Sequence, residues 1–174
     1  MSGFDGTLDL TGANPDAVGF PAIPSGVYEG HVGKAQWKQT ENVDGSKKLP
    51  HGTSYLAIGF RVSPDHEPVD GVEVAGVYGG WVNLYVPPAD YDKAKAQRMK
   101  NMMANFLSSI GEDYTRKGYK VPEAEELIGK ELVAVIRKKP DNTQADGYKN
   151  EIEGFKPAGT AAESQGAGVG TGLR

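Results

Sequence analysis

Aromatic and basic side chains are interleaved along several stretches that the sequence predicts to be strands, and they are the residues with the clearest chemistry. Aromatic rings stack on unpaired bases, at about 1–3 kcal/mol per base, while lysine and arginine bind phosphates. Single-stranded nucleic acid is the ligand class that needs both kinds of group on one surface. The candidate binding residues are Lys34, Trp37, Lys38, Tyr55, Arg61, Trp81, Tyr85, Arg137, Lys138, Tyr148 and Lys149.

Each of these residues also has a purely structural explanation. Trp81 is equally compatible with a place in the core, beneath a helix or the N-terminal arm. Tyr55 and Tyr85 match the ordinary aromatic residues of a sheet surface. The run 137–139, Arg-Lys-Lys, matches a charged strand end that keeps a sheet edge soluble. The sequence leaves both explanations open.

Residues that could catalyse a reaction are few. The three histidines show no metal-binding spacing, and no serine-nucleophile or phosphate-loop motif occurs. Asp65-His66-Glu67 could hold a cation, but it lies in a proline-rich turn. The chain has no cysteine, which excludes disulfide and thiolate chemistry. We expect a protein without catalytic activity, cofactor or metal, with a metal-dependent enzyme as the weaker alternative.

Length and charge set further bounds. The 174 residues allow one domain with a substantial core. No apolar run approaches the ~20 residues that cross a bilayer, and the N-terminus lacks the pattern of a secretory signal, so we expect a cytoplasmic protein without membrane contact. The net charge of -4 argues against binding nucleic acid by bulk charge. However, residues 1–25 carry three acids and no base, whereas residues 93–120 carry seven Lys/Arg and two acids, which permits a local positive surface.

An amphipathic helix is predicted from Asp90 to Ile110. Its apolar residues recur at helical spacing and share one face, with Asp90 as the N-cap and Gly111 as the stop. The apolar face consists of Met99, Met102, Met103, Phe106, Leu107 and Ile110. A second, short helical turn is predicted between Pro122 and Gly129.

Five strands flank this helix, three before it and two after it. They are predicted at Gly26–Gln39, Ser54–Val62, Val74–Val86, Glu131–Lys138 and Tyr148–Phe155. Gly30 and Gly33, inside the first strand, indicate a bulge or a sharp bend. Alternation in the third strand places Tyr78 on the face of Val82 and Leu84, opposite Trp81.

This order predicts a mainly β protein, a five-stranded OB-fold Greek-key barrel with the amphipathic helix between strands three and four. An open α+β sheet with one covering helix is the alternative. Residues 26–157 form the predicted nucleic-acid-binding domain. Residues 1–25 form a flexible N-terminal arm, pinned by Phe20 or Ile23, and residues 158–174 form a disordered Gly/Ala-rich tail.

Several segments together resemble a known family over residues 26–157. They are GVYEG at 26–30, YLAIGFRV at 55–62, ELIGKELVAVIRKK at 126–139 and YKNEIEGFKP at 148–157. In element order and in these motifs the chain resembles the small single-stranded-DNA-binding proteins encoded by bacteriophages. The resemblance implies an OB-fold protein that coats single-stranded DNA during phage replication, recombination or repair, in the host cytoplasm and without catalysis.

The resemblance also bears on partners. It implies single-stranded DNA as the ligand and leaves contacts with phage recombination or replication proteins, and self-association, as open alternatives. Many single-stranded-DNA-binding proteins recruit partners through an acidic C-terminal tip, whereas this tail has only Glu163 and ends in Leu173-Arg174. A structural phage protein, such as a capsid decoration or assembly β-barrel, is the alternative from another functional class.

Overall fold

The computed structural model describes residues 5–12, 22–41, 49–144 and 146–160, and its elements follow the predicted order. The strands are β1 (Gly26–Gln39), β2 (Ser54–Val62), β3 (Tyr78–Tyr85), β4 (Glu131–Pro140) and β5 (Tyr148–Pro157). Helices α1 (Lys93–Ser109) and α2 (Ala124–Leu127) lie between β3 and β4. The third strand is shorter than predicted, because Val74 is buried in the loop before it.

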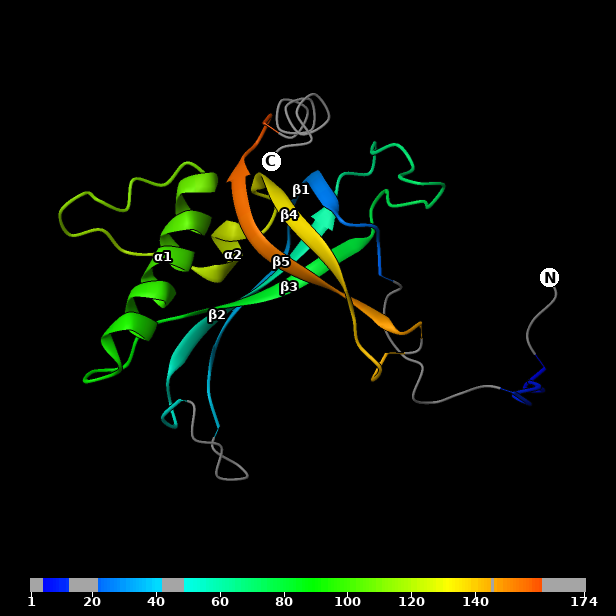
Figure 1. The fold of residues 1–174 in the computed structure, drawn as a ribbon, viewed down its shortest axis with the longest axis horizontal. Helices are drawn as coiled ribbons and strands as arrows, with labels where there is room; N and C mark the ends of the chain where they lie inside the picture. Colours follow the sequence, from blue (N-terminus) through cyan, green and yellow to red (C-terminus); the bar gives the residue numbers. More distant parts are fainter. Residues whose placement is uncertain (1–4, 13–21, 42–48, 145, 161–174) are drawn as a thin grey trace.

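The five strands form a nearly closed barrel (Figure 1). They pair antiparallel in the order β3-β2-β1-β4-β5, and the end strands β3 and β5 come together. At that seam Gly80 faces β5 so closely that a Cβ there would stand 3.0 Å from Cγ1 of Ile152. This strand order, with a helix between β3 and β4, is that of an OB-type Greek-key barrel. The fold prediction is confirmed over the open-sheet alternative.

The first strand is shared by both halves of the barrel. Its residues 26–31 pair with β4 and its residues 30–39 pair with β2. Gly30 lies where the two pairings overlap, and a Cβ there would stand 2.1 Å from the carbonyl oxygen of Arg61. At Gly33 the β1–β2 register shifts by one residue, which is the irregularity that a β-bulge produces. The predicted bend of this strand is therefore present.

The barrel core follows from the alternation of the strands. In β2, Leu56, Ile58, Phe60 and Val62 are all buried, as predicted, while the intervening residues face outward. The other large buried side chains include Tyr28, Val32, Leu84, Leu127, Leu132 and Ile136.

Helix α1 begins two residues later than predicted, because Asp92 rather than Asp90 is the N-cap. The Asp92 carboxylate accepts a hydrogen bond from the backbone N–H of Lys95 at 2.9 Å, whereas Asp90 has a left-handed backbone with a φ of 61°. Phe106 and Leu107 are buried, and Met102, Met103 and Ile110 pack around them. Five of the six residues of the predicted apolar face therefore pack on the barrel core, whereas Met99 is partly buried but is not part of that cluster.

Two contacts fix α1 to β5. The side-chain amide of Asn105 donates to the carbonyl oxygen of Phe155 at 3.0 Å and accepts from its N–H at 2.8 Å. The rings of Phe106 and Phe155 meet edge to face, with centroids 5.4 Å apart. The helix therefore satisfies backbone groups of an end strand and covers the core at the same time.

The predicted N-terminal arm contributes to the core at its C-terminal end. Ile23 is 2% exposed, and its N–H and carbonyl oxygen both bond to the side chain of Asn150, at 2.8 Å each. Phe20 and the C-terminal residues 161–174 lie outside the described residues. Within the described ranges, neither helix has the length and apolar character of a membrane span.

Candidate functional site

The side of β1, β2 and β3 that points away from the core carries most of the candidate residues, and we call it the outer face. Cross-strand pairing arranges its residues in rows. The rows are Lys38–Tyr55–Tyr85, Gln36–Ala57–Asn83 and Lys34–Gly59–Trp81, followed by Arg61 opposite Tyr78. Six of the eleven predicted binding residues therefore share one surface.

Four of these side chains form a continuous stack. The rings of Tyr78 and Trp81 are nearly parallel, at 13°, with centroids 5.3 Å apart. The Arg61 guanidinium lies 5.3 Å from the Tyr78 centroid, and Lys34 Nζ lies 5.9 Å from the Trp81 centroid. Each of the two rings thus has one cation near it, an arrangement favoured by attraction between a positive charge and an aromatic face.

Two glycines make room for this stack. A Cβ at Gly59 would stand 2.6 Å from Cζ3 of Trp81, and one at Gly33 would stand 2.8 Å from Cε1 of Tyr78. Because neither glycine has a side chain, both rings lie close against the sheet. Trp81 nevertheless remains 48% exposed. Of the two positions that the sequence left open for Trp81, the structure shows the exposed one.

A second aromatic pair lies in the row of Lys38. The rings of Tyr55 and Tyr85 are 5.1 Å apart and tilted by 42°. The side-chain amide of Asn83 donates to the Tyr85 hydroxyl at 3.5 Å. Tyr55 and Tyr85 are both partly buried, so each presents part of a ring to solvent.

A depression of about 350 Å³ separates the two aromatic pairs, and we call it the strand-face hollow. Trp81 lies on one side of it and Tyr55 on the other, with Lys34 and Lys38 along β1. Gln36, Ala57 and Asn83 form its middle row, and Ile128, 50% exposed, reaches it from the loop after α2. None of the described residues that line it is acidic. The hollow is therefore a cationic site with aromatic walls.

Trp37 lies on the other side of the sheet. It is paired with buried Leu56, is partly buried, and packs against the barrel core. The bulge at Gly33 explains this position, because one extra residue exchanges the faces of all later β1 residues. The predicted set Lys34, Trp37 and Lys38 is thus divided, with the two lysines on the outer face.

The remaining four candidates lie on β4 and β5, two antiparallel paired strands that follow each other in the chain. Arg137 forms an ion pair with Glu153 at 2.7 Å, and Lys139 forms one with Glu151 at 2.6 Å. Lys138 Nζ lies 4.4 Å from the Tyr148 ring centroid, and Tyr148 is 43% exposed. Lys149 is also exposed. Of these basic residues, Arg137 is already neutralised, whereas Lys138 and Tyr148 form an exposed cation–aromatic pair.

Tyr78 is a site residue that the strand alternation misplaced. The β2–β3 register skips Gly79, so Tyr78 is opposite Arg61 on the outer face and not on the core face with Leu84. Gly79 itself faces inward, where a Cβ would stand 2.6 Å from Cδ1 of Ile136. The Gly79-Gly80 pair is the sequence signal of this bulge. Asn83 shares the alternation of Trp81 and Tyr85, which places it on this face, whereas Ile128 had no comparable signal.

Acidic groups gather elsewhere. Glu29, Asp65 and Glu131 line another depression, where the Glu29 carboxylate accepts a hydrogen bond from the N–H of Gly159 at 2.6 Å. His66 lies against the ring of Tyr28, at 5.2 Å between centroids. Among the described residues, no group of three or more histidine and acidic side chains is placed to hold a metal ion.

Comparisons with known proteins add no family to this description. No protein-family model matches the chain, and no curated protein matches it in sequence.

Proposed function

We propose that this chain is a sequence-tolerant, non-catalytic single-stranded-DNA-binding protein that acts in bacteriophage DNA replication, recombination or repair. The observation that carries the proposal is the outer face, where Trp81 and Tyr55 border a hollow whose described lining includes Lys34 and Lys38 and no acidic residue. An OB-type barrel binds oligonucleotides on the surface of strands two and three, which is the surface concerned here.

The chemistry of the outer face favours an unpaired strand. A base stacks on the exposed face of Trp81 and a neighbouring base stacks on Tyr55, while the lysines contact the phosphates between them. In a duplex the base faces are covered by neighbouring pairs, so these rings have nothing to stack on. The cationic residues alone then give weaker, salt-sensitive binding.

Sequence tolerance follows from the same contacts. Stacking needs only a π face, which every base has, and phosphate contacts are independent of sequence. The amides of Gln36 and Asn83 are the polar groups in the middle of the hollow, and either can donate to or accept from any base edge. The phage setting and the cytoplasmic location rest on the resemblance of residues 26–157 to phage single-stranded-DNA-binding proteins.

The proposal is tested by titrating the full chain against a labelled oligo-dT of about 30 nucleotides, longer than the ~4–16 nucleotides that one OB fold covers. Fluorescence anisotropy is read at low and high salt, with a duplex of the same length as the control. We expect tight binding to the single strand that weakens steeply with salt, and much weaker binding to the duplex. Absence of binding at low salt would reject the proposal in favour of the structural phage protein.

A further inference from the structure

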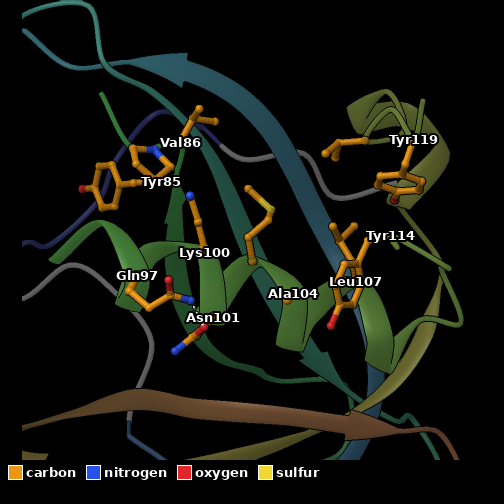
Figure 2. A pocket seen from close by; sticks show the side chains of 12 residues that line it. Tyr85, Val86, Gln97, Lys100, Asn101, Ala104, Leu107, Tyr114 and Tyr119 are labelled. Carbon is orange, nitrogen blue, oxygen red and sulfur yellow. Dashed lines mark hydrogen bonds between the residues drawn. The ribbon is translucent and has the colours of Figure 1, made fainter. Parts of the chain in front are cut away.

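A second, larger depression of about 550 Å³ lies beside the outer face, and we call it the helix groove (Figure 2). It is bounded by the end of β3, by α1, and by the segment from Tyr114 to Val121 that follows α1. The residues proposed above as DNA contacts do not account for it, apart from Tyr85, which lines it.

The lining of the helix groove combines tyrosines with uncharged and basic polar groups. Tyr85 lies at one end and Tyr114 and Tyr119 at the other, as Figure 2 shows, with Lys100 pointing up from α1 toward Tyr85. Tyr114 is 43% exposed. Gln97 and Asn101 add side-chain amides, hydrogen-bonded to each other at 2.9 Å. As in the strand-face hollow, none of the lining residues that the structure describes is acidic.

Tyr119 is held in a fixed position. Its hydroxyl donates to the Glu112 carboxylate at 2.9 Å, and the Arg116 guanidinium lies 5.8 Å from its ring centroid. Burial and the Glu112 contact raise the pKa of Tyr119 to about 12, so the ring stays neutral. An aromatic ring held in place in this way loses little conformational freedom when a ligand stacks on it.

The helix groove is continuous with the outer face through one aromatic contact. Tyr85 lines the groove, and its ring lies 5.1 Å from that of Tyr55, which lines the strand-face hollow. The rings that border the two depressions are therefore Trp81 and Tyr55 at the strand-face hollow and Tyr85 and Tyr114 at the helix groove, and the Tyr55–Tyr85 contact links the two pairs.

Charge favours an anionic occupant along this path. In a chain of net charge -4, residues 93–120, which include α1 and part of the groove wall, carry seven Lys/Arg and two acids. The depression that does contain acidic residues, with Glu29, Asp65 and Glu131, is a different one. The helix groove and the strand-face hollow are thus linked by the Tyr55–Tyr85 contact, whereas the acidic depression shares no lining residue with either.

We propose that the helix groove is an extension of the DNA site and takes bases of the same single strand that crosses the outer face, with Tyr114 as a stacking residue and Lys100 as a phosphate contact. This inference rests on the proposed function and specifies the path of the bound strand across the protein. Apolar walls with tyrosines at both ends accommodate base faces, and Lys100 meets the backbone charge. The strand then occupies both depressions in succession.

The test compares two oligo-dT lengths, about 6 and about 20 nucleotides, within and beyond the ~4–16 that one OB fold covers. Binding of the full chain is measured by anisotropy for the wild type, Tyr114→Ala, Lys100→Ala and Trp81→Ala. Lys93→Ala is the matched control for Lys100→Ala, because Lys93 is an exposed lysine of the same helix that does not line the groove. Circular dichroism verifies that each variant is folded.

We expect Tyr114→Ala and Lys100→Ala to bind the longer oligonucleotide roughly 5–10-fold more weakly, because each loses a stacking or a phosphate contact in the groove. The shorter oligonucleotide should bind as it does to the wild type. Trp81→Ala should weaken both lengths. If both groove variants bind the longer oligonucleotide as tightly as Lys93→Ala does, while Trp81→Ala binds it more weakly, the groove is not part of the site. That result would overturn this inference and leave the proposed function standing. Failure of the wild type to bind either length would overturn the proposed function with it.

An anilinonaphthalene sulfonate dye, which fluoresces in apolar sites, gives an independent measurement. We expect the longer oligonucleotide to displace dye from the wild type and the shorter one to leave it bound. Dye that remains bound at a saturating concentration of the longer oligonucleotide would contradict the inference and favour a protein partner as the occupant of the groove. Tyr114→Ala with less dye bound would confirm that the signal comes from the groove.

Discussion

The indole of Trp81 lies directly over Gly59: a Cβ at this glycine would stand 2.6 Å from Cζ3, 2.8 Å from Cη2 and 2.9 Å from Cε3 of the ring. The exposed face of Trp81 therefore depends on a missing side chain in the neighbouring strand. Gly59 sits in β2 between the buried residues Ile58 and Phe60, so the same strand forms the core with one face and supports the ring with the other.

Replacing Gly59 with alanine tests this relationship. The three atoms nearest the new methyl group belong to the side chain of half-exposed Trp81, so we expect the ring to be displaced while the barrel stays folded. We expect affinity for single-stranded oligo-dT to fall roughly 5–10-fold, the loss of part of a stacking contact of about 1–3 kcal/mol. Anisotropy measures the affinity and thermal unfolding measures the stability.

Gly30→Ala is the contrasting variant. There the Cβ would stand 2.1 Å from the backbone oxygen of Arg61 and 2.6 Å from Cζ of buried Phe60, and neither can move freely. We expect a loss of at least the ~1–3 kcal/mol typical of an overpacked core, seen as a lower urea midpoint. Equal stability of the two alanine variants would contradict the assignment of Gly59 to ring support and Gly30 to the barrel bend.

The basic residues should differ in their contribution to DNA binding. Lys38 is exposed on the outer face and forms no ion pair among the described residues, whereas Arg137 is paired with Glu153. The slope of log K against log salt is negative. We expect Lys38→Ala to make it less negative by about 0.7, the value for one phosphate contact on a single strand, and Arg137→Ala to change it less. The slopes come from titrations at four or more salt concentrations. A larger effect of Arg137→Ala would place the main phosphate path on β4 and β5.

Asn105 should contribute strongly to stability although it is an exposed residue of α1. Asn105→Ala removes both hydrogen bonds to the backbone of Phe155 and leaves an N–H and a carbonyl oxygen without those partners. We expect a loss of about 1–3 kcal/mol in the free energy of unfolding, measured by urea denaturation. Asn101→Ala, on the same helix, is the control, because it removes only an exposed bond to Gln97. If both variants lose equally little stability, Asn105 does not fasten the helix to β5.

Stability at alkaline pH should depend on Tyr28. Burial, with the charge of Asp70, raises the pKa of Tyr28 to about 12, and its hydroxyl donates to the carbonyl oxygen of Pro24 at 2.5 Å. Because the phenol ionises near pH 10 in the unfolded chain, the unfolded state loses this proton first, and stability falls between pH 10 and about 12. Tyr28→Phe should reduce that fall, measured as urea midpoints at pH 8 and pH 11. An unchanged difference between the two pH values would show that Tyr28 is not its source.

The sequence predicted the order of strands and helices because hydrophobic periodicity and turn residues are local signals. The apolar face of α1 and the inward residues of β2, such as Phe60, are in their predicted positions. Trp37 and Tyr78 are on unexpected faces for one shared reason. Each lies beyond a glycine bulge, and a single extra residue exchanges the two faces of a strand. Alternation alone does not show which of several glycines carries the bulge.

The sequence predicted which residue types form the candidate site better than it predicted which of those residues lie together. Lys34 and Lys38 meet Tyr55, Trp81 and Tyr85 because β1, β2 and β3 are neighbours, which the predicted OB order contains. The helix groove depends on how α1 and the segment after it pack beside β3. That packing is tertiary, and no local pattern in residues 112–121 indicates it.

The central claim is that bases stack on Trp81, and intrinsic fluorescence tests it most directly because the chain has two tryptophans, Trp37 and Trp81. In Trp37→Phe the emission comes from Trp81 alone, and in Trp81→Phe it comes from partly buried Trp37 alone. Oligo-dT is added to each variant at low salt, with the duplex as control. We predict strong quenching in Trp37→Phe and little change in Trp81→Phe. Quenching only in the variant that retains Trp37 would contradict the account and place the bound strand away from the outer face.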